Sequence, residues 1–232
     1  MVDPRLAEPE QDQAPRHSGT SRRLPAEQRR SQLFDVALLL FAERGYSATT
    51  MDDIAEAAGV TKPLLYQHFD SKRALYLELC EAISQRIIAQ VGQATAVAAG
   101  PRQQVELGFA AFFSLVADDE AAFRFLWGRD VPDDPEVGKA LRRVEDAIAE
   151  AIDPLIDAGL DPDHRLTLAH AVVGMAEGAC RRWIDSRQFH YAEGGDILDD
   201  DARFASRHAE ADRMAVRLAD LAWAGLRQVH RV

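Results

Sequence analysis

Apolar residues recur every three to four positions along most of the chain, whereas the strict alternation typical of β-strands is almost absent. Leu33, Ala37, Leu40 and Phe41 form one such stripe, which predicts the buried face of a long helix. The pattern predicts an all-α protein of about nine helices, at residues 26–44, 51–58, 62–68, 72–98, 102–117, 120–127, 135–153, 162–186 and 202–228.

Capping residues support these divisions. Gly45 stands where a helix usually ends, and Thr50 followed three residues later by Asp53 forms a capping-box pattern at the start of the next helix. Ser71 is a cap for the long fourth helix. Asp134 is followed directly by Pro135, an order typical of a helix start.

The second and third helices are both short, and only Gly59, Val60 and Thr61 separate them. Such a short turn forces a steep crossing and turns the third helix outward, where it can enter a DNA major groove. The inward set that fixes this hairpin is predicted to be Ile54, Ala58, Val60, Leu65 and Phe69. The outward set is Thr61, Lys62, Leu64, Tyr66, Gln67 and His68.

This segment resembles the TetR family of bacterial regulators. The family pattern appears as Ile54-Ala55, Ala58-Gly59-Val60-Thr61, Leu65-Tyr66, His68-Phe69 and Ser71-Lys72. The resemblance covers about residues 32–76. It implies a dimer whose N-terminal helices bind an inverted-repeat operator, usually as a repressor, and whose C-terminal helices hold a ligand pocket and the dimer interface.

By position, the resemblance implies phosphate contacts from Thr50, Tyr66 and Lys72, and base-edge contacts from Lys62, Leu64 and Gln67. Leu64 stands where the family often has Thr, so contact with a thymine methyl replaces a hydrogen bond there. Two alternatives stay open for His68, namely a phosphate contact or packing against the first helix.

The net charge of −11 looks unfavourable for a DNA-binding protein, but its distribution is uneven. Residues 21–73 contain eight Lys and Arg against seven Asp and Glu, whereas residues 74–232 contain 17 against 27. The acidic excess therefore lies mostly outside the expected DNA-binding segment.

The second half carries a dense set of large apolar side chains, and these are candidates for a ligand-binding site. They are Phe109, Phe112, Phe113, Phe123, Trp127, Met175 and Trp183. An ordinary core is the alternative for each of them, while the family resemblance favours a pocket for a large apolar effector. Candidates for placed polar groups are Arg124, Arg129, Glu177 and Arg181.

Three further stretches are similar to actinobacterial TetR-type regulators of fatty-acid metabolism, and this similarity implies a long-chain acyl-CoA as effector. They are residues 24–30, residues 62–69, and Val172-Val173-Gly174-Met175 with Trp183. A multidrug-sensing repressor of an efflux gene is the alternative within the family.

The last two helices are expected to form the homodimer as a four-helix bundle. The first carries Leu166, Ala169, Val173, Ala176 and Cys180, with Gly174 and Gly178 permitting close approach. The second carries Phe204, Ala211, Ala215, Leu218, Ala222 and Gly225, with Leu221 and Trp223 near the stripe. Packing within one chain is the alternative. We expect three segments, namely a disordered arm at 1–23, a DNA-binding domain at 24–71, and a ligand-binding and dimerisation domain at 72–232.

Other classes of protein find little support. His164 and His170 are six residues apart and do not share a helix face, and no catalytic signature, metal-ligand spacing or cofactor motif appears, so an enzyme is not expected. A helical protein-interaction domain without DNA binding is the remaining rival. Without a signal peptide or a long apolar run, we expect a cytoplasmic protein.

Overall fold

A computed structural model describes residues 25–128, 134–156, 159–192 and 199–227. Within these residues the regular structure is entirely helical, which confirms the predicted all-α class. The elements are α1 (Ala26–Ala48), α2 (Met51–Ala57), α3 (Lys62–His68), α4 (Lys72–Ala96), α5 (Pro101–Asp118), α6 (Glu120–Trp127), α7 (Pro135–Ile152), the 3₁₀-helix η1 (Asp153–Leu155), α8 (Pro162–Ala192) and α9 (Asp200–Leu226).

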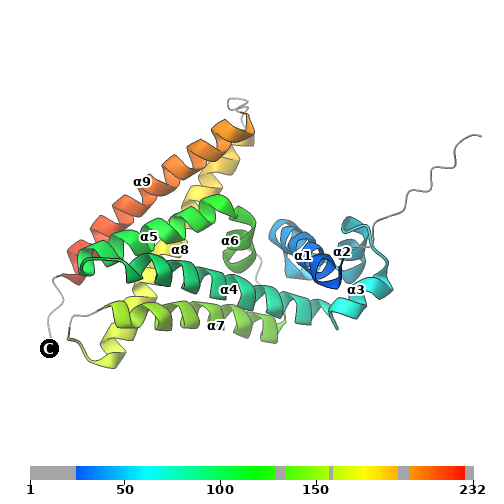
Figure 1. Ribbon diagram of the computed structural model, residues 1–232, viewed down its shortest axis with the longest axis horizontal. Helices are drawn as coiled ribbons and strands as arrows, with labels where there is room; N and C mark the ends of the chain where they lie inside the picture. Colours follow the sequence, from blue (N-terminus) through cyan, green and yellow to red (C-terminus); the bar gives the residue numbers. More distant parts are fainter. Residues whose placement is uncertain (1–24, 129–133, 157–158, 193–198, 228–232) are drawn as a thin grey trace, which may run out of the picture.

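The three N-terminal helices gather at one end of the molecule, and the long α4 leads away from them (Figure 1). The helices α5 and α7 both pack along α4, while α9 packs along α5 and α8 packs against α7. The short α6 lies against α1. The N-terminal helices therefore meet the rest of the chain through α4 and α6.

Aromatic side chains fill the contact between these two parts. The rings of Tyr76 on α4 and Phe125 on α6 lie 4.4 Å apart, and Phe41 on α1 lies 5.1 Å from Tyr76. All three are buried. Because edge-to-face and offset ring contacts are directional, this cluster holds α1, α4 and α6 in a defined arrangement.

Two helix ends differ from the sequence-based boundaries by four or more residues, while the other ends differ by at most two. Gly45 does interrupt helical geometry, with φ of 80°, but the chain resumes helical turns and α1 reaches Ala48. A positive φ costs glycine little, so Gly45 makes the bend possible. The other difference is in α8, which continues to Ala192 and not just to residue 186.

The expected arm at residues 1–23 lies outside the described residues. Within the described ranges, no helix is both long enough and apolar enough to span a lipid bilayer.

Candidate DNA-binding surface and cavity

The start of α2 is fixed by a reciprocal capping box. Thr50 Oγ1 accepts from the backbone N–H of Asp53 at 3.1 Å, and Asp53 Oδ2 accepts from the backbone N–H of Thr50 at 2.8 Å. The Thr50 hydroxyl also donates to Asp53 Oδ2 at 2.6 Å. These bonds lower the pKa of Asp53, chiefly through the Thr50 hydroxyl and then through its N–H. A DNA phosphate at Thr50 would compete with this carboxylate.

The turn between α2 and α3 depends on Gly59. Its φ of +64° lies in the left-handed region, where a side chain would be strained. Behind the turn, Ile54, Leu65 and Phe69 are buried, with Leu65 fully inaccessible to solvent. This part of the predicted inward set therefore holds α3 against α1 and α2 as one unit.

The predicted outward residues of α3 fall into two groups. Thr61, Lys62, Tyr66 and Gln67 are exposed, with 43% of Tyr66 accessible. Leu64 and His68 are only partly exposed, and the His68 ring centre lies 6.4 Å from that of Phe69.

Like Thr50, two further expected DNA contacts have intramolecular partners in this structure. Lys62 Nζ lies 2.8 Å from the Asp52 carboxylate, which raises the pKa of Lys62 through a hydrogen bond and charge attraction. Lys72 Nζ donates to the carbonyl of Tyr46 at 2.7 Å and lies 4.2 Å from the centre of its ring. Tyr46 was not singled out by the sequence, and no local signal marks it.

A second junction links this end of the molecule to α7. Asp134 caps α7 and also accepts from Arg73 at 2.8 Å, while the Tyr46 hydroxyl lies 3.5 Å away. Although burial acts to raise the pKa of Asp134, hydrogen bonds from Arg73 and from the Glu136 amide lower it overall. The carboxylate thus connects α1, α4 and α7 in its ionised form.

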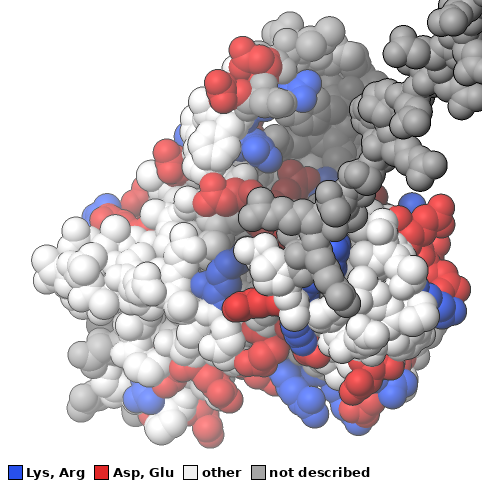
Figure 2. All heavy atoms as spheres, turned by 45° about the vertical axis from the view of Figure 1, so that its right-hand side comes forward, with Lys and Arg blue, Asp and Glu red and all other residues white. Residues whose placement is uncertain are grey.

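Charges of both signs are interspersed on the face shown in Figure 2, where no continuous basic surface appears. This agrees with the nearly balanced charge of residues 21–73 in the sequence. On this face, single placed side chains and not a continuous positive field are therefore available for polar contacts.

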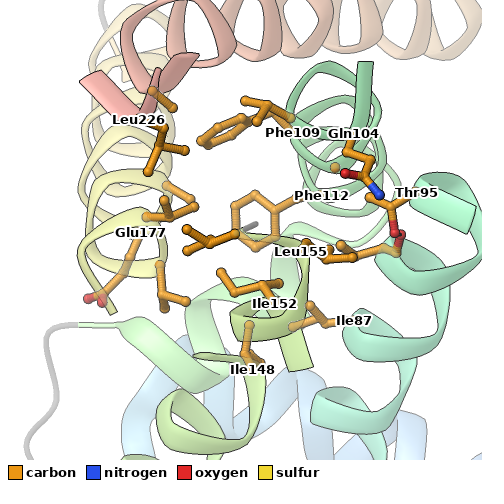
Figure 3. A pocket seen from close by; sticks show the side chains of 18 of the residues that line it. Ile87, Thr95, Gln104, Phe109, Phe112, Ile148, Ile152, Leu155, Glu177 and Leu226 are labelled. Atoms are coloured by element: carbon orange, nitrogen blue, oxygen red, sulfur yellow. The ribbon is translucent and has the colours of Figure 1, made fainter. Parts of the chain in front are cut away.

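The second half contains an apolar cavity, called the main cavity below. Its empty space is about 850 Å³, which includes the part open to solvent. Its walls come from six helices and η1. The lining side chains include Ile87 and Val91 of α4, Phe109 and Phe112 of α5, Ile148 and Ile152 of α7, Val173 of α8 and Leu226 of α9. Figure 3 shows Phe109, Leu226 and Ile148 among the apolar side chains that surround the space. Such a lining suits an apolar ligand.

The predicted ligand-binding residues are distributed unevenly around this cavity. Phe109, Phe112 and Trp127 line it, and Phe123 lines a smaller hollow beside it. The other three do not line it: Phe113 is buried 6.3 Å from the Trp183 ring, Trp183 donates to Glu210, and Met175 is only partly buried.

Among the predicted polar groups, Glu177 lies at the edge of the main cavity. Its carboxylate pairs with Arg181 and is directed away from the apolar side chains in Figure 3. Burial is the main cause that raises the pKa of Glu177. Arg124 pairs with Glu120 on its own helix, and Arg129 lies outside the described residues.

The stripes expected at the dimer interface are largely occupied within the chain. Ala211, Ala215 and Ala222 are buried in α9, which packs along α5. Ala169 and Cys180 are buried in α8. The predicted stripes are thus mostly buried within one chain, whereas Phe204 on the second stripe is 49% exposed. The dimer interface itself stays a prediction. The surfaces that remain open on α9 include Val216 and Leu221, each 62% exposed.

Comparison with known proteins shows similarity in both sequence and fold. Residues 33–79 match the family described as bacterial regulatory proteins, tetR family. The chain is 34% identical over 166 residues to the HTH-type transcriptional activator FasR of Mycolicibacterium smegmatis, across 71% of this chain and 76% of that protein.

Two solved structures share the fold. A TetR-like transcriptional regulator from Rhodococcus sp. RHA1 aligns with a TM-score of 0.66 at 24% identity, over 89% of this chain and all of that one. FadR from Bacillus subtilis, in complex with stearoyl-CoA, aligns with a TM-score of 0.63 at 18% identity, over 82% of this chain and 97% of that one. At these identities the structures indicate a common fold.

Proposed function

The chain belongs to the tetR family of bacterial regulatory proteins, and from that premise we propose that it is an acyl-responsive regulator that binds an inverted-repeat operator as a homodimer. It is a DNA-binding transcriptional regulator and not an enzyme. The observation that carries the proposal is the main cavity, whose almost wholly apolar walls suit a long hydrocarbon chain. A long-chain acyl-CoA is the proposed effector.

One comparison supports that effector class, and a second bears on the direction of regulation. The FadR neighbour was solved with stearoyl-CoA, an acyl-CoA with a long saturated chain. The relative matched over most of this chain, FasR, is named an activator, whereas the family resemblance implies repression. The direction of regulation depends on where the operator lies relative to the promoter, so a reporter assay measures it directly.

In the proposed complex, residues 24–71 form the DNA-binding domain, and α3 enters the major groove. Tyr66, Lys72 and Thr50 contact phosphates, while Lys62, Leu64 and Gln67 contact base edges, joined by Thr61 and His68 at the margin. On binding DNA, the Lys62 ammonium group leaves the Asp52 carboxylate and contacts the DNA instead. Because phosphate contacts release counterions, affinity should fall steeply as salt increases.

Residues 72–232 form the proposed ligand-binding and dimerisation domain. A second copy would cover the outer faces of α8 and α9, including Val216 and Leu221, because apolar side chains this exposed favour burial in an interface. The oligomeric state in solution, measured by light scattering, tests this arrangement.

The effector proposal is tested by a cavity-filling variant, Gly108→Leu. A Cβ at Gly108 would lie 3.5 Å from Thr95 Cγ2, an ordinary contact, so a side chain enters the cavity without displacing the backbone. Leucine also favours helix more than glycine does, so α5 should be retained. The matched control is Ala110→Leu, an exposed position on the same helix.

We expect saturating stearoyl-CoA to raise the melting temperature of the wild type and of Ala110→Leu by about 5 °C. Gly108→Leu should show no shift while still binding fragments of the DNA upstream of its own coding sequence. A shift that persists in Gly108→Leu would contradict the cavity assignment. If no acyl-CoA of any chain length stabilises the wild type but an unrelated apolar drug does, the multidrug-sensing alternative replaces this proposal.

A further inference from the structure

The main cavity adjoins a second space, called the side hollow, between the C-terminal parts of α4 and α7. The empty space of the side hollow is about 750 Å³, which includes the part open to solvent. It reaches the surface beside Gly92 and Ala96, both of which are exposed. The two spaces share Thr95 and Gln104 together with five apolar side chains, so a ligand chain can continue from one into the other.

Gln104 carries the polar group at this junction that is available to bind a ligand. Among the described residues its side-chain amide has no hydrogen-bond partner, although it is partly buried. The neighbouring Thr95 hydroxyl already donates to the Val91 carbonyl at 2.9 Å. An amide offers two N–H donors and one acceptor oxygen. Figure 3 shows it beside Thr95 at the margin of the apolar walls.

The charges that line both spaces indicate whether Gln104 binds a charged or an uncharged group of the ligand. No Lys or Arg lines either space within the described residues, and the carboxylate of Glu177 is bound by Arg181 at the far margin. A bare anion would find no counter-charge here. An uncharged carbonyl oxygen, by contrast, could accept a hydrogen bond from the Gln104 amide.

We propose that Gln104 binds the carbonyl oxygen of the effector's acyl group and so fixes its position at the junction. The hydrocarbon then extends into the main cavity, and the polar remainder of the molecule leaves through the side hollow. This rests on the proposed function, because it requires an acylated effector. Gln104 is thus the residue that distinguishes an acyl chain from a plain alkyl chain of equal length.

The test compares two probes that differ only in the carbonyl, palmitoyl-CoA and its thioether analogue S-hexadecyl-CoA. Titration calorimetry on the full chain gives both affinities. The wild type should bind the thioester about threefold to tenfold more tightly, the range expected for one uncharged hydrogen bond. Gln104→Leu should bind both probes equally, and so should Gln104→Met, which keeps a long unbranched side chain.

The control is Gln93→Leu, which changes the same residue type at an exposed position of α4 outside both spaces. It should keep the wild-type preference. Equal binding of both probes by the wild type, or a preference that persists in Gln104→Leu, would overturn the role of Gln104 while leaving the acyl effector in place. Failure of the wild type to bind either probe would overturn the proposed function itself and this inference with it.

Discussion

The two ends of this molecule are built on different physical requirements. Around α2 and α3, short helices are held by particular groups, namely the Thr50–Asp53 capping box, the left-handed Gly59 and the fully buried Leu65. Around the main cavity, long helices surround empty space with aliphatic and aromatic walls that are largely interchangeable in chemistry. One end is defined by exact positions and the other by an enclosed volume.

This difference predicts how much stability each end loses when a buried side chain is shortened. A helix that reads DNA must present its side chains at fixed positions, so losses in its small core change the geometry directly. A cavity wall faces empty space on one side, so each wall residue has fewer contacts to lose. The same chemical change should therefore cost more stability in α3 than beside the cavity.

The largest expected effect compares Leu65→Ala with Ile152→Ala. Leu65 is fully buried in the small core behind α3, so its truncation should lower the free energy of unfolding by about 3 kcal/mol. Ile152 lines the cavity and is only partly buried, so its truncation should cost about 1 kcal/mol. Urea denaturation at equal protein concentration measures both, since association contributes to stability. Equal losses would show that the cavity walls are packed as closely as the core behind α3.

A smaller effect is expected on the DNA-binding surface, where function should change without stability. Tyr66→Phe removes one hydroxyl from an exposed ring and should weaken operator binding by about tenfold, the value of a hydrogen bond to a charged phosphate. Gln67→Ala should instead relax the preference at one base pair. Fluorescence anisotropy with operator and scrambled DNA separates the two outcomes.

The matched control for these variants is Gln85→Ala, an exposed residue of α4 that bonds only to Glu81 among the described residues. It should leave operator affinity unchanged. Unaltered binding by both Tyr66→Phe and Gln67→Ala would remove α3 as the reading helix and would erase the functional side of the contrast between the two ends.

The sequence predicted short-range features of the molecule better than contacts between distant residues. Helix starts at Thr50, Ser71 and Asp134 were predicted because caps act on residues two or three positions away. The contacts of Asp134 with Arg73 and Tyr46 were not predicted, because they join residues 61 and 88 positions apart and leave no local pattern. The sequence therefore predicts helix caps, which act over a few residues, but not contacts between residues far apart in the chain.

The cavity shows the same limit. The sequence analysis named Phe112 and Phe113 alike as candidates for the ligand-binding site, and the structure places only Phe112 at the cavity. Phe113 packs beside Trp183 in the closed core. Apolar periodicity predicts that a face is buried, but whether that face meets another helix or empty space depends on how several helices assemble.

The smallest effect sharpens the comparison at the first turn of α2. Thr50→Ala removes the side-chain cap and should lower the free energy of unfolding by about 1 kcal/mol at pH 7. The Thr50 bonds lower the pKa of Asp53, so their contribution is present above the unfolded pKa of about 4 and is lost as the pH falls through the folded value. The stability difference between wild type and Thr50→Ala should therefore shrink below pH 4.

Thr50→Ser is the matched control, since serine keeps the hydroxyl that bonds to Asp53 and should preserve both the stability and its pH dependence. Denaturant titrations of the three proteins at several pH values between 3 and 7 measure this. If the difference between wild type and Thr50→Ala is the same at every pH, then the Asp53 carboxylate does not hold the first turn of α2. In that case α3 would be positioned by its buried apolar side chains alone, as the cavity helices are, and the contrast between the two ends would narrow to the density of packing.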